Sequence, residues 1–229
     1  LCSATVINDN GNPGRSLLIT AAHCVYDQVN DIFASTFLFI PKQDDGGPDG
    51  TAQNCFNDPY GCWAPEFGVI ASGWADGVWS NNIPYDFAVL VVPDSGAHEG
   101  PAGTNPALDQ AVQPMEVDFT NEQSLITGSW AHYMGYPQKD KSGAVIDPSF
   151  RYCYGPLTEQ SNGWKMSACN MGGGASGGPA QPDPNGNGKI FSVVSWGYEN
   201  SPTMGGPYLH NNAFSCIFEV AKYYSGTDG

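Results

Sequence analysis

A serine within a glycine-rich run is the first candidate for chemistry in this sequence. Ser176 lies in residues 172–179, which read Gly-Gly-Gly-Ala-Ser-Gly-Gly-Pro. Glycines on both sides let a backbone turn sharply and approach a ligand closely. Such a turn could expose the Ser176 hydroxyl and aim the N–H groups of Gly174 and Ser176 at one point. Taken alone, the run also fits a flexible turn, whereas a phosphate-binding loop is disfavoured because no Lys-Ser or Lys-Thr follows it.

A serine hydroxyl is a weak nucleophile, so it needs an adjacent base and a group that holds that base in its tautomer. His23 is a candidate base, since it ends the run Leu-Ile-Thr-Ala-Ala-His at residues 18–23. Asp86 is a candidate partner because it opens an apolar run, residues 87–92. A buried aspartate is costly unless it is hydrogen-bonded, and a histidine N–H would satisfy it. A structural histidine and a turn-forming aspartate are the alternatives when each is considered singly.

Together these segments resemble the trypsin/chymotrypsin family of serine endopeptidases. The matching motifs are Thr-Ala-Ala-His-Cys, Asp-Phe-Ala-Val-Leu, Gly-Ala-Ser-Gly-Gly-Pro and Val-Val-Ser-Trp-Gly, in the family's order. The resemblance implies that His23 is the general base, Asp86 orients it and Ser176 is the nucleophile, with Gly174 and Ser176 forming the oxyanion hole. It also implies a set of substrate-binding residues: Asn170, Gly173, Ser195, Trp196 and Gly197.

The implied activity is hydrolysis of protein or peptide substrates through an acyl-enzyme, without cofactor or metal. One alternative is a catalytically inactive, protease-like binding protein, although the three residues of the triad are intact. An esterase of the α/β-hydrolase type is disfavoured, because its serine precedes its acid and histidine along the chain.

Two positions depart from the trypsin pattern, and one feature departs from the glutamyl endopeptidases. Ala175 replaces the aspartate that pairs with a newly cleaved N-terminus, so the chain is more similar to secreted microbial, glutamyl-endopeptidase-like members of the family. Asn170 stands where trypsin has its specificity aspartate, so cleavage after Arg or Lys is not expected. The acid-binding histidine of glutamyl endopeptidases is not matched, since Val194 and Ser195 lie there. We therefore expect a neutral or broad preference.

Short apolar runs separated by turns must position these residues. The 229 residues include 29 glycines and 18 prolines, which favours an all-β fold. Strands are expected at 3–7, 17–20, 36–40, 68–72, 87–92, 125–127, 131–135, 149–154 and 190–195. Residues 213–224 have apolar side chains at helical spacing and predict a C-terminal helix.

The resemblance implies that these elements form two antiparallel β-barrels. Residues 1–100 are expected to form an N-terminal barrel that carries His23 and Asp86. Residues 115–229 form a C-terminal barrel that carries Ser176 and ends in the helix, and residues 93–114 form a linker. The active site is then expected between the barrels.

The cysteines indicate an oxidising, extracellular setting. We expect three disulfides between cysteines close in sequence: Cys2–Cys24, Cys55–Cys62 and Cys153–Cys169. Cys216 is left over. One hypothesis pairs it with a cysteine in an upstream segment, or in a separate chain cut from the same precursor, and a buried free thiol is the alternative. Leu1 is not a start methionine, so a processed or truncated chain is expected whose targeting segment has been removed.

The charge balance disfavours several classes of partner. The chain has 8 basic and 23 acidic residues, a net charge of −15, and no basic patch for nucleic acid is visible. No apolar run of about 18 residues is present to cross a membrane.

Two segments could bind calcium. For residues 183–188 a hairpin turn is the favoured interpretation, and for the acidic loop with Asp44, Asp45 and Asp49 a solvated loop is favoured.

Overall fold

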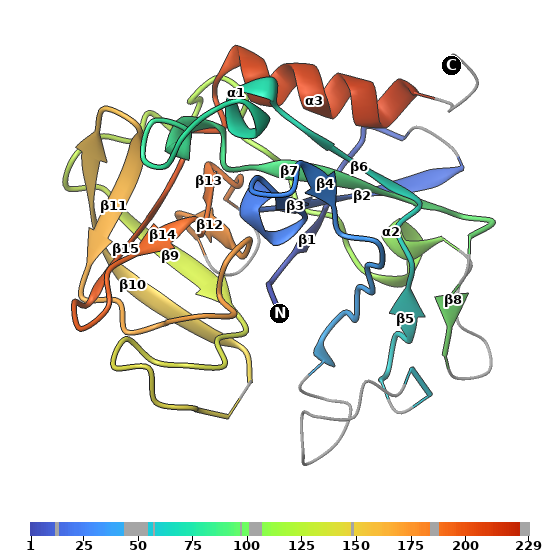
Figure 1. Ribbon diagram of the computed structural model, residues 1–229, viewed down its shortest axis with the longest axis horizontal. Coiled ribbons are helices and arrows are strands. Elements are labelled where there is room, and N and C mark those ends of the chain that lie inside the picture. The colour runs from blue at the N-terminus through green and yellow to red at the C-terminus, as the bar shows by residue number, and fades with distance from the viewer. Residues whose placement is uncertain are drawn as a thin grey trace.

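In the computed structural model the chain folds into two β-sheet units that lie beside each other (Figure 1). The structure describes residues 1–11, 14–43, 55–56, 58–96, 98–100, 107–147, 149–183 and 188–224. The fold is all-β with a C-terminal helix, as predicted. The calcium alternatives at residues 44, 45 and 49 lie outside these residues, as does most of the loop at 183–188.

The first unit is an antiparallel sheet with the order β1-β2-β7-β6. Its strands are β1 (Thr5–Ile7), β2 (Arg15–Thr20), β6 (Phe67–Ile70) and β7 (Ala88–Pro93). The two central strands are almost entirely buried, which accounts for their unbroken apolar sequence. Two small ribbons flank the sheet: β3 (Tyr26–Asp27) with β4 (Ile32–Phe33), and β5 (Cys62–Trp63) with β8 (His98–Glu99).

Short helical turns connect these strands: η1 (Ala22–Cys24), α1 (Ser72–Ala75), η3 (Ile83–Tyr85) and α2 (Leu108–Ala111). Two of them matter for the candidate site. The turn η1 follows β2 directly, and η3 ends immediately before Asp86, which precedes β7. Because β2 and β7 are antiparallel neighbours, the end of β2 and the start of β7 place His23 and Asp86 at the same end of the sheet.

The second unit is a seven-stranded antiparallel sheet with the order β13-β12-β9-β10-β11-β15-β14. Its strands are β9 (Trp130–Gly135), β10 (Arg151–Gln160), β11 (Gly163–Ser167), β12 (Pro179–Gln181), β13 (Ser192–Val193), β14 (Trp196–Gly197) and β15 (Thr203–Gly206). The two edge strands β13 and β14 are joined by Val194 and Ser195. Because one continuous segment supplies both edges, the sheet closes on itself as a barrel.

A shared apolar core joins the two units. It combines Val89 and Val91 of β7 with Val193 and with Phe214 of α3 (Asn212–Tyr223). Phe87, next to Asp86, packs edge-to-face on Phe214 with ring centroids 5.2 Å apart. Asn211 caps this helix by accepting a hydrogen bond from the Phe214 N–H at 2.8 Å. The C-terminal helix, which crosses the top of Figure 1, thus fixes the sheet that carries His23 and Asp86 against the second barrel.

Two strand predictions are wrong. Residues 36–40 form no strand and pair with the rest of the fold only where Phe39 and Trp63 exchange two backbone hydrogen bonds of 2.8 Å. Residues 125–127 lead into a turn, since the Ile126 carbonyl accepts from the Ser129 N–H and the Ile126 N–H donates to the Ser129 hydroxyl. Residues 93–114, expected as a plain linker, include β8 and α2.

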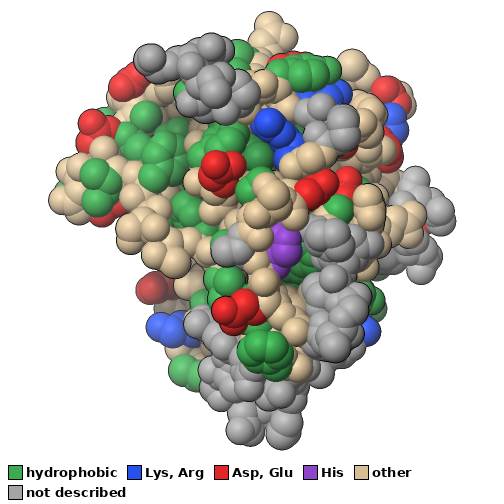
Figure 2. Space-filling view, turned by 90° about the vertical axis from the view of Figure 1, so that its right-hand side faces the viewer, with side chains coloured by type: hydrophobic (Ala, Val, Ile, Leu, Met, Phe, Trp, Pro, Cys, Tyr) green, Lys and Arg blue, Asp and Glu red, His purple; other side chains and the backbone are tan. Residues whose placement is uncertain are grey.

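Charged side chains are spread over the face of the molecule that Figure 2 shows. On the face in Figure 2, acidic side chains are scattered among apolar and neutral ones, and the few Lys and Arg side chains do not gather into a continuous patch. Among the described residues, none of the helices has the length and apolar character needed to cross a membrane.

Candidate active site

His23 is held at the end of β2 by the turn η1. Ala21 is extended and the next three residues form a helical turn, so the chain bends where the histidine begins. The Cys2–Cys24 disulfide adds a covalent link directly beside the histidine. The His23 side chain keeps 31% of its surface exposed, which leaves one edge of the imidazole open to a ligand.

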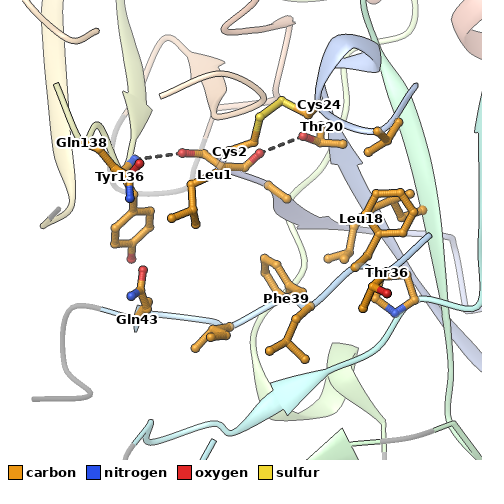
Figure 3. Close-up of a pocket in the computed structure, with 18 residues that line it drawn as sticks. Leu1, Cys2, Leu18, Thr20, Cys24, Thr36, Phe39, Gln43, Tyr136 and Gln138 are labelled. Carbon is orange, nitrogen blue, oxygen red and sulfur yellow. Dashed lines mark hydrogen bonds between the residues drawn. A yellow bond between two sulfur atoms is a disulfide. The ribbon is translucent and has the colours of Figure 1, made fainter. Parts of the chain in front are cut away.

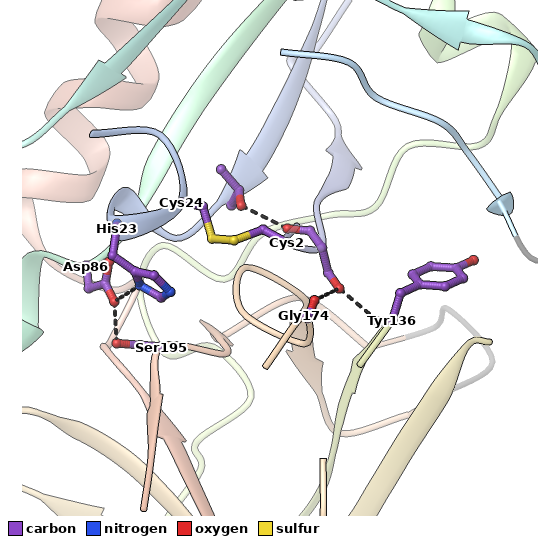
Figure 4. The surroundings of a disulfide bond; sticks show 9 residues. Cys2, His23, Cys24, Asp86, Tyr136, Gly174 and Ser195 are labelled. Atoms are coloured by element: carbon purple, nitrogen blue, oxygen red, sulfur yellow. Dashed lines mark hydrogen bonds and ion pairs between the residues drawn. A yellow bond between two sulfur atoms is a disulfide. The ribbon is translucent and has the colours of Figure 1, made fainter. Parts of the chain in front are cut away.

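Asp86 is fully buried and faces His23 with both carboxylate oxygens (Figure 4). Its Oδ2 lies 2.7 Å from His23 Nδ1, and its Oδ1 accepts the His23 backbone N–H at 2.9 Å. A carboxylate beside Nδ1 favours the tautomer in which Nδ1 carries the proton and Nε2 is free to act as a base.

Ser195 adds a third donor to the same carboxylate. Its hydroxyl donates to Asp86 Oδ2 at 2.6 Å, and its side chain comes from the segment that joins β13 to β14. Three donors compensate the cost of burying the charge. The sequence predicted Ser195 as a substrate-binding residue and gave no indication of this second contact.

The loop around Ser176 is tightly constrained by neighbouring backbone. Gly174 has a φ of +101°, and a Cβ there would lie 2.7 Å from the Tyr136 carbonyl oxygen. Gly177 has a φ of +82°, and a Cβ there would overlap Thr20 Oγ1 and the Ser3 carbonyl oxygen. Only glycine fits both the conformation and the space at these two positions. In the described part of the chain, the N–H groups of Gly174 and Ser176 make no hydrogen bond, so both remain available to a ligand oxygen.

Ser3 ties the serine loop to the disulfide that flanks His23. Its hydroxyl donates to the Gly174 carbonyl at 2.9 Å and accepts from the Tyr136 N–H at 2.8 Å. Its backbone N–H donates to the Ser176 carbonyl at 2.7 Å. Sequence reasoning missed Ser3, and its position next to Cys2 is the one signal that could have found it.

Two adjoining hollows surround the candidate triad. One, of about 850 Å³, is lined by His23, Trp74 and the β3–β4 ribbon. The other, of about 350 Å³, is lined by Ser176 and by the segment 194–199, and we call it the serine hollow. Trp79 and Ser195 line both. His23 and Ser176 therefore face neighbouring hollows that share two residues, and we call the pair of hollows the groove.

The structure brings most of the predicted substrate-binding residues to the serine hollow. Gly173, Ser195, Trp196 and Gly197 line it together with Ser176. Asn170 is exposed and is not among the lining residues, so the structure does not place it where the sequence alignment with trypsin put the specificity residue. Among the residues that the structure describes, no hydrogen bond joins the Ser176 hydroxyl to His23. Such contacts are often long in a ligand-free enzyme and tighten when substrate binds.

A third cavity lies on the other side of the Cys2–Cys24 disulfide (Figure 3). It has a volume of about 270 Å³ and is lined by Leu1, Leu18, Phe39 and Tyr136, among others. None of the candidate triad lines it.

Among the described residues, the side chains around His23 offer no suitable set of metal ligands. Across the described residues, the one group of potential ligands close enough to share an ion is Cys2, His23 and Cys24. The two sulfur atoms form a disulfide and offer no thiolate.

All three predicted disulfides are confirmed: Cys2–Cys24, Cys55–Cys62 and Cys153–Cys169. Cys216 carries none and is exposed on α3, so the buried-thiol alternative is wrong.

Comparison with known proteins agrees with this geometry. Residues 2–187 match the family described as the trypsin-like peptidase domain. The chain belongs to this family of serine proteases. No curated protein is matched.

Three solved structures of the trypsin-like group illustrate the relationship. Protease Anisep from Arthrobacter nicotinovorans is 25% identical, with a TM-score of 0.71 over 96% of this chain and 88% of its own. The thermostable serine protease AL20 from an extremophilic microorganism is also 25% identical, with a TM-score of 0.72 over 98% and 91%. A Glu endopeptidase shares the fold at 22% identity, with a TM-score of 0.63 over 96% and 90%.

Proposed function

We propose that the chain is a secreted serine endopeptidase in which Ser176 attacks the peptide carbonyl and forms an acyl-enzyme. In this mechanism His23 Nε2 takes the Ser176 proton and later gives it to the leaving amine. Water then releases the acyl group by the same route. The free N–H groups of Gly174 and Ser176 stabilise the negative carbonyl oxygen in the transition state.

The observation that carries this proposal is the contact of Asp86 with His23. Both carboxylate oxygens bond to the same histidine, one to its backbone and one to its ring, and the carboxylate is fully buried. A structural histidine needs no such double restraint, whereas a general base must be held in one tautomer and one orientation. The three disulfides support secretion, because such bonds persist in oxidising compartments.

Labelling with a fluorophosphonate tests the proposal, because this reagent modifies a serine that is activated as a nucleophile. We expect one adduct on Ser176 by peptide mass mapping, and no adduct in Ser176→Ala. His23→Ala should lower peptide hydrolysis by several orders of magnitude. A chain that folds with its three disulfides but takes no label and hydrolyses no peptide would instead be the inactive binding protein.

A further inference from the structure

A lysine ammonium group lies inside the serine hollow. Lys141 lines this hollow together with Ser176, and its Nζ occupies the space that a Cβ on Gly197 would fill. Gly197 belongs to β14, directly after the Ser195–Trp196 segment. The absence of a side chain at Gly197 is therefore what lets the lysine head group enter the hollow.

The Lys141 side chain is largely buried, while its ammonium group opens onto the hollow without a partner among the described residues. The residue is only 9% exposed, and among the residues that the structure describes its ammonium group makes no hydrogen bond and no ion pair. Burial accordingly lowers the pKa of Lys141 below its usual value. A buried cation is expensive unless an opposite charge or hydrogen-bond acceptors compensate it. An incoming carboxylate would supply both.

The loop that carries Lys141 is held on two sides. The Lys141 carbonyl accepts from the Asn200 N–H at 2.7 Å, which ties the loop to the segment after β14. The neighbouring Lys139 carbonyl accepts from the Gly172 N–H at 2.8 Å, which ties it to the serine loop. The lysine therefore sits on a backbone fixed to both walls of the hollow, and such preorganisation favours specific binding.

The other charged residues of the hollow do not neutralise Lys141. Asp140 directs its Oδ1 to the Ser142 N–H and hydroxyl, at 2.8 and 2.6 Å. Glu199 and Lys139 are exposed, and no ion pair links Glu199 to Lys141. Among the described residues that line the hollow beside Ser176, Lys141 is thus the one charged side chain that is largely buried.

We infer that Lys141 selects substrates with an acidic side chain, glutamate or aspartate, at the residue whose carbonyl Ser176 attacks. This inference rests on the proposed function, because it assigns the serine hollow to the side chain next to the attacked carbonyl. The side-chain carboxylate binds the Lys141 ammonium group and compensates its buried charge. The assignment replaces the neutral or broad preference expected from Asn170, which does not line the hollow.

Matched peptides that differ only at this residue test the inference. We expect kcat/KM to be about 10- to 100-fold higher for Glu than for its isostere Gln, the effect of one hydrogen bond between charged groups. Lys141→Gln should bring this ratio close to one, while Lys141→Arg retains a clear preference for Glu. Lys165→Gln is the matched control, because it removes one lysine charge from β11 at a position that lines neither hollow, and its ratio should equal that of the unmodified chain.

A binding measurement separates this inference from the proposed function. Calorimetry with Ser176→Ala compares two product peptides that end in Glu or in Gln, so it needs no catalysis. One outcome is that Ser176 takes the fluorophosphonate label but neither hydrolysis nor product binding prefers Glu. This outcome would overturn the role of Lys141 and still support the proposed endopeptidase. Tighter binding of the Glu product by a chain that takes no label would support Lys141 and reject the endopeptidase.

Discussion

Replacing Ser195 by alanine removes one of the three hydrogen bonds that the buried Asp86 carboxylate accepts. The Ser195 hydroxyl is 2.6 Å from Asp86 Oδ2, and the two residues are 6% and 0% exposed. Water therefore cannot readily replace the lost donor. His23 keeps both of its own bonds to the carboxylate, so its orientation should persist in the variant.

The expected cost follows from the charge of the acceptor. A hydrogen bond to a charged group contributes about 1.5–3 kcal/mol, against about 0.5–1.5 kcal/mol between neutral groups. For a chain of this size, the loss lowers the unfolding temperature by roughly 3–12 °C. We expect kcat/KM to fall by less than about tenfold, because His23 and Ser176 are unchanged and the Ser195 backbone still lines the serine hollow.

Ser192→Ala is the matched control. Ser192 is also fully buried on the same segment, but its hydroxyl donates to the neutral Pro207 carbonyl at 2.7 Å. Urea unfolding of both variants in a Ser176→Ala background avoids self-digestion and gives the two free energies of unfolding. A Ser195→Ala variant that costs no more than Ser192→Ala would refute the argument that Ser195 stabilises a buried charge.

Three further variants test the fold, and all are measured by the free energy of unfolding. Gly177→Ala should lower the free energy of unfolding by about 1–3 kcal/mol or more, because its Cβ would overlap Thr20 Oγ1 and the Ser3 carbonyl. Gly173→Ala is the control, because its Cβ would meet nothing within 4 Å, and it should change the free energy of unfolding by less than about 0.5 kcal/mol. Burial alone would raise the pKa of Asp118, but the N–H groups of Glu122, Gln123 and Thr120 hold it below its usual value. Because a lowered carboxyl pKa contributes stability above about pH 4 that is lost as pH falls through the folded-state value, Asp118→Ala should cost about 1–3 kcal/mol at pH 7 and progressively less towards pH 2. An Asp118→Ala cost that is the same at pH 7 and pH 2 would contradict this reasoning.

The sequence predicted strands well where burial leaves an unbroken apolar run. Residues 87–92 and 17–20 were expected as strands and lie in β7 and β2, because both faces of these strands are covered. Residues 125–127 have a similarly apolar appearance, yet Ile126 is 66% exposed and lies beside a turn. Local hydrophobicity cannot distinguish these cases, since the difference depends on which distant residues cover the segment.

The residues of the candidate site also differ in how far local sequence could reveal them. His23, Asp86 and Ser176 stand in motifs whose local pattern is informative, so the sequence was sufficient to propose them. Lys141 has no motif around it, and its importance depends on a contact with Gly197 that only the folded chain creates. Asn170 shows the converse, because its matching position in the sequence does not bring it into the lining of the serine hollow.

The contacts between the two units suggest why this site forms only when both are folded. Ser195, from the second barrel, donates to Asp86 of the first sheet, and Ser3, from the first unit, donates to the carbonyl of Ser176 in the second. Each unit thus supplies a donor for an acceptor in the other, on either side of the groove. Because the buried Asp86 carboxylate would lose the Ser195 hydrogen bond if the units separated, their association and the satisfaction of that charge are coupled. A ligand that bridges the groove should therefore stabilise the whole chain against unfolding, and not one unit alone.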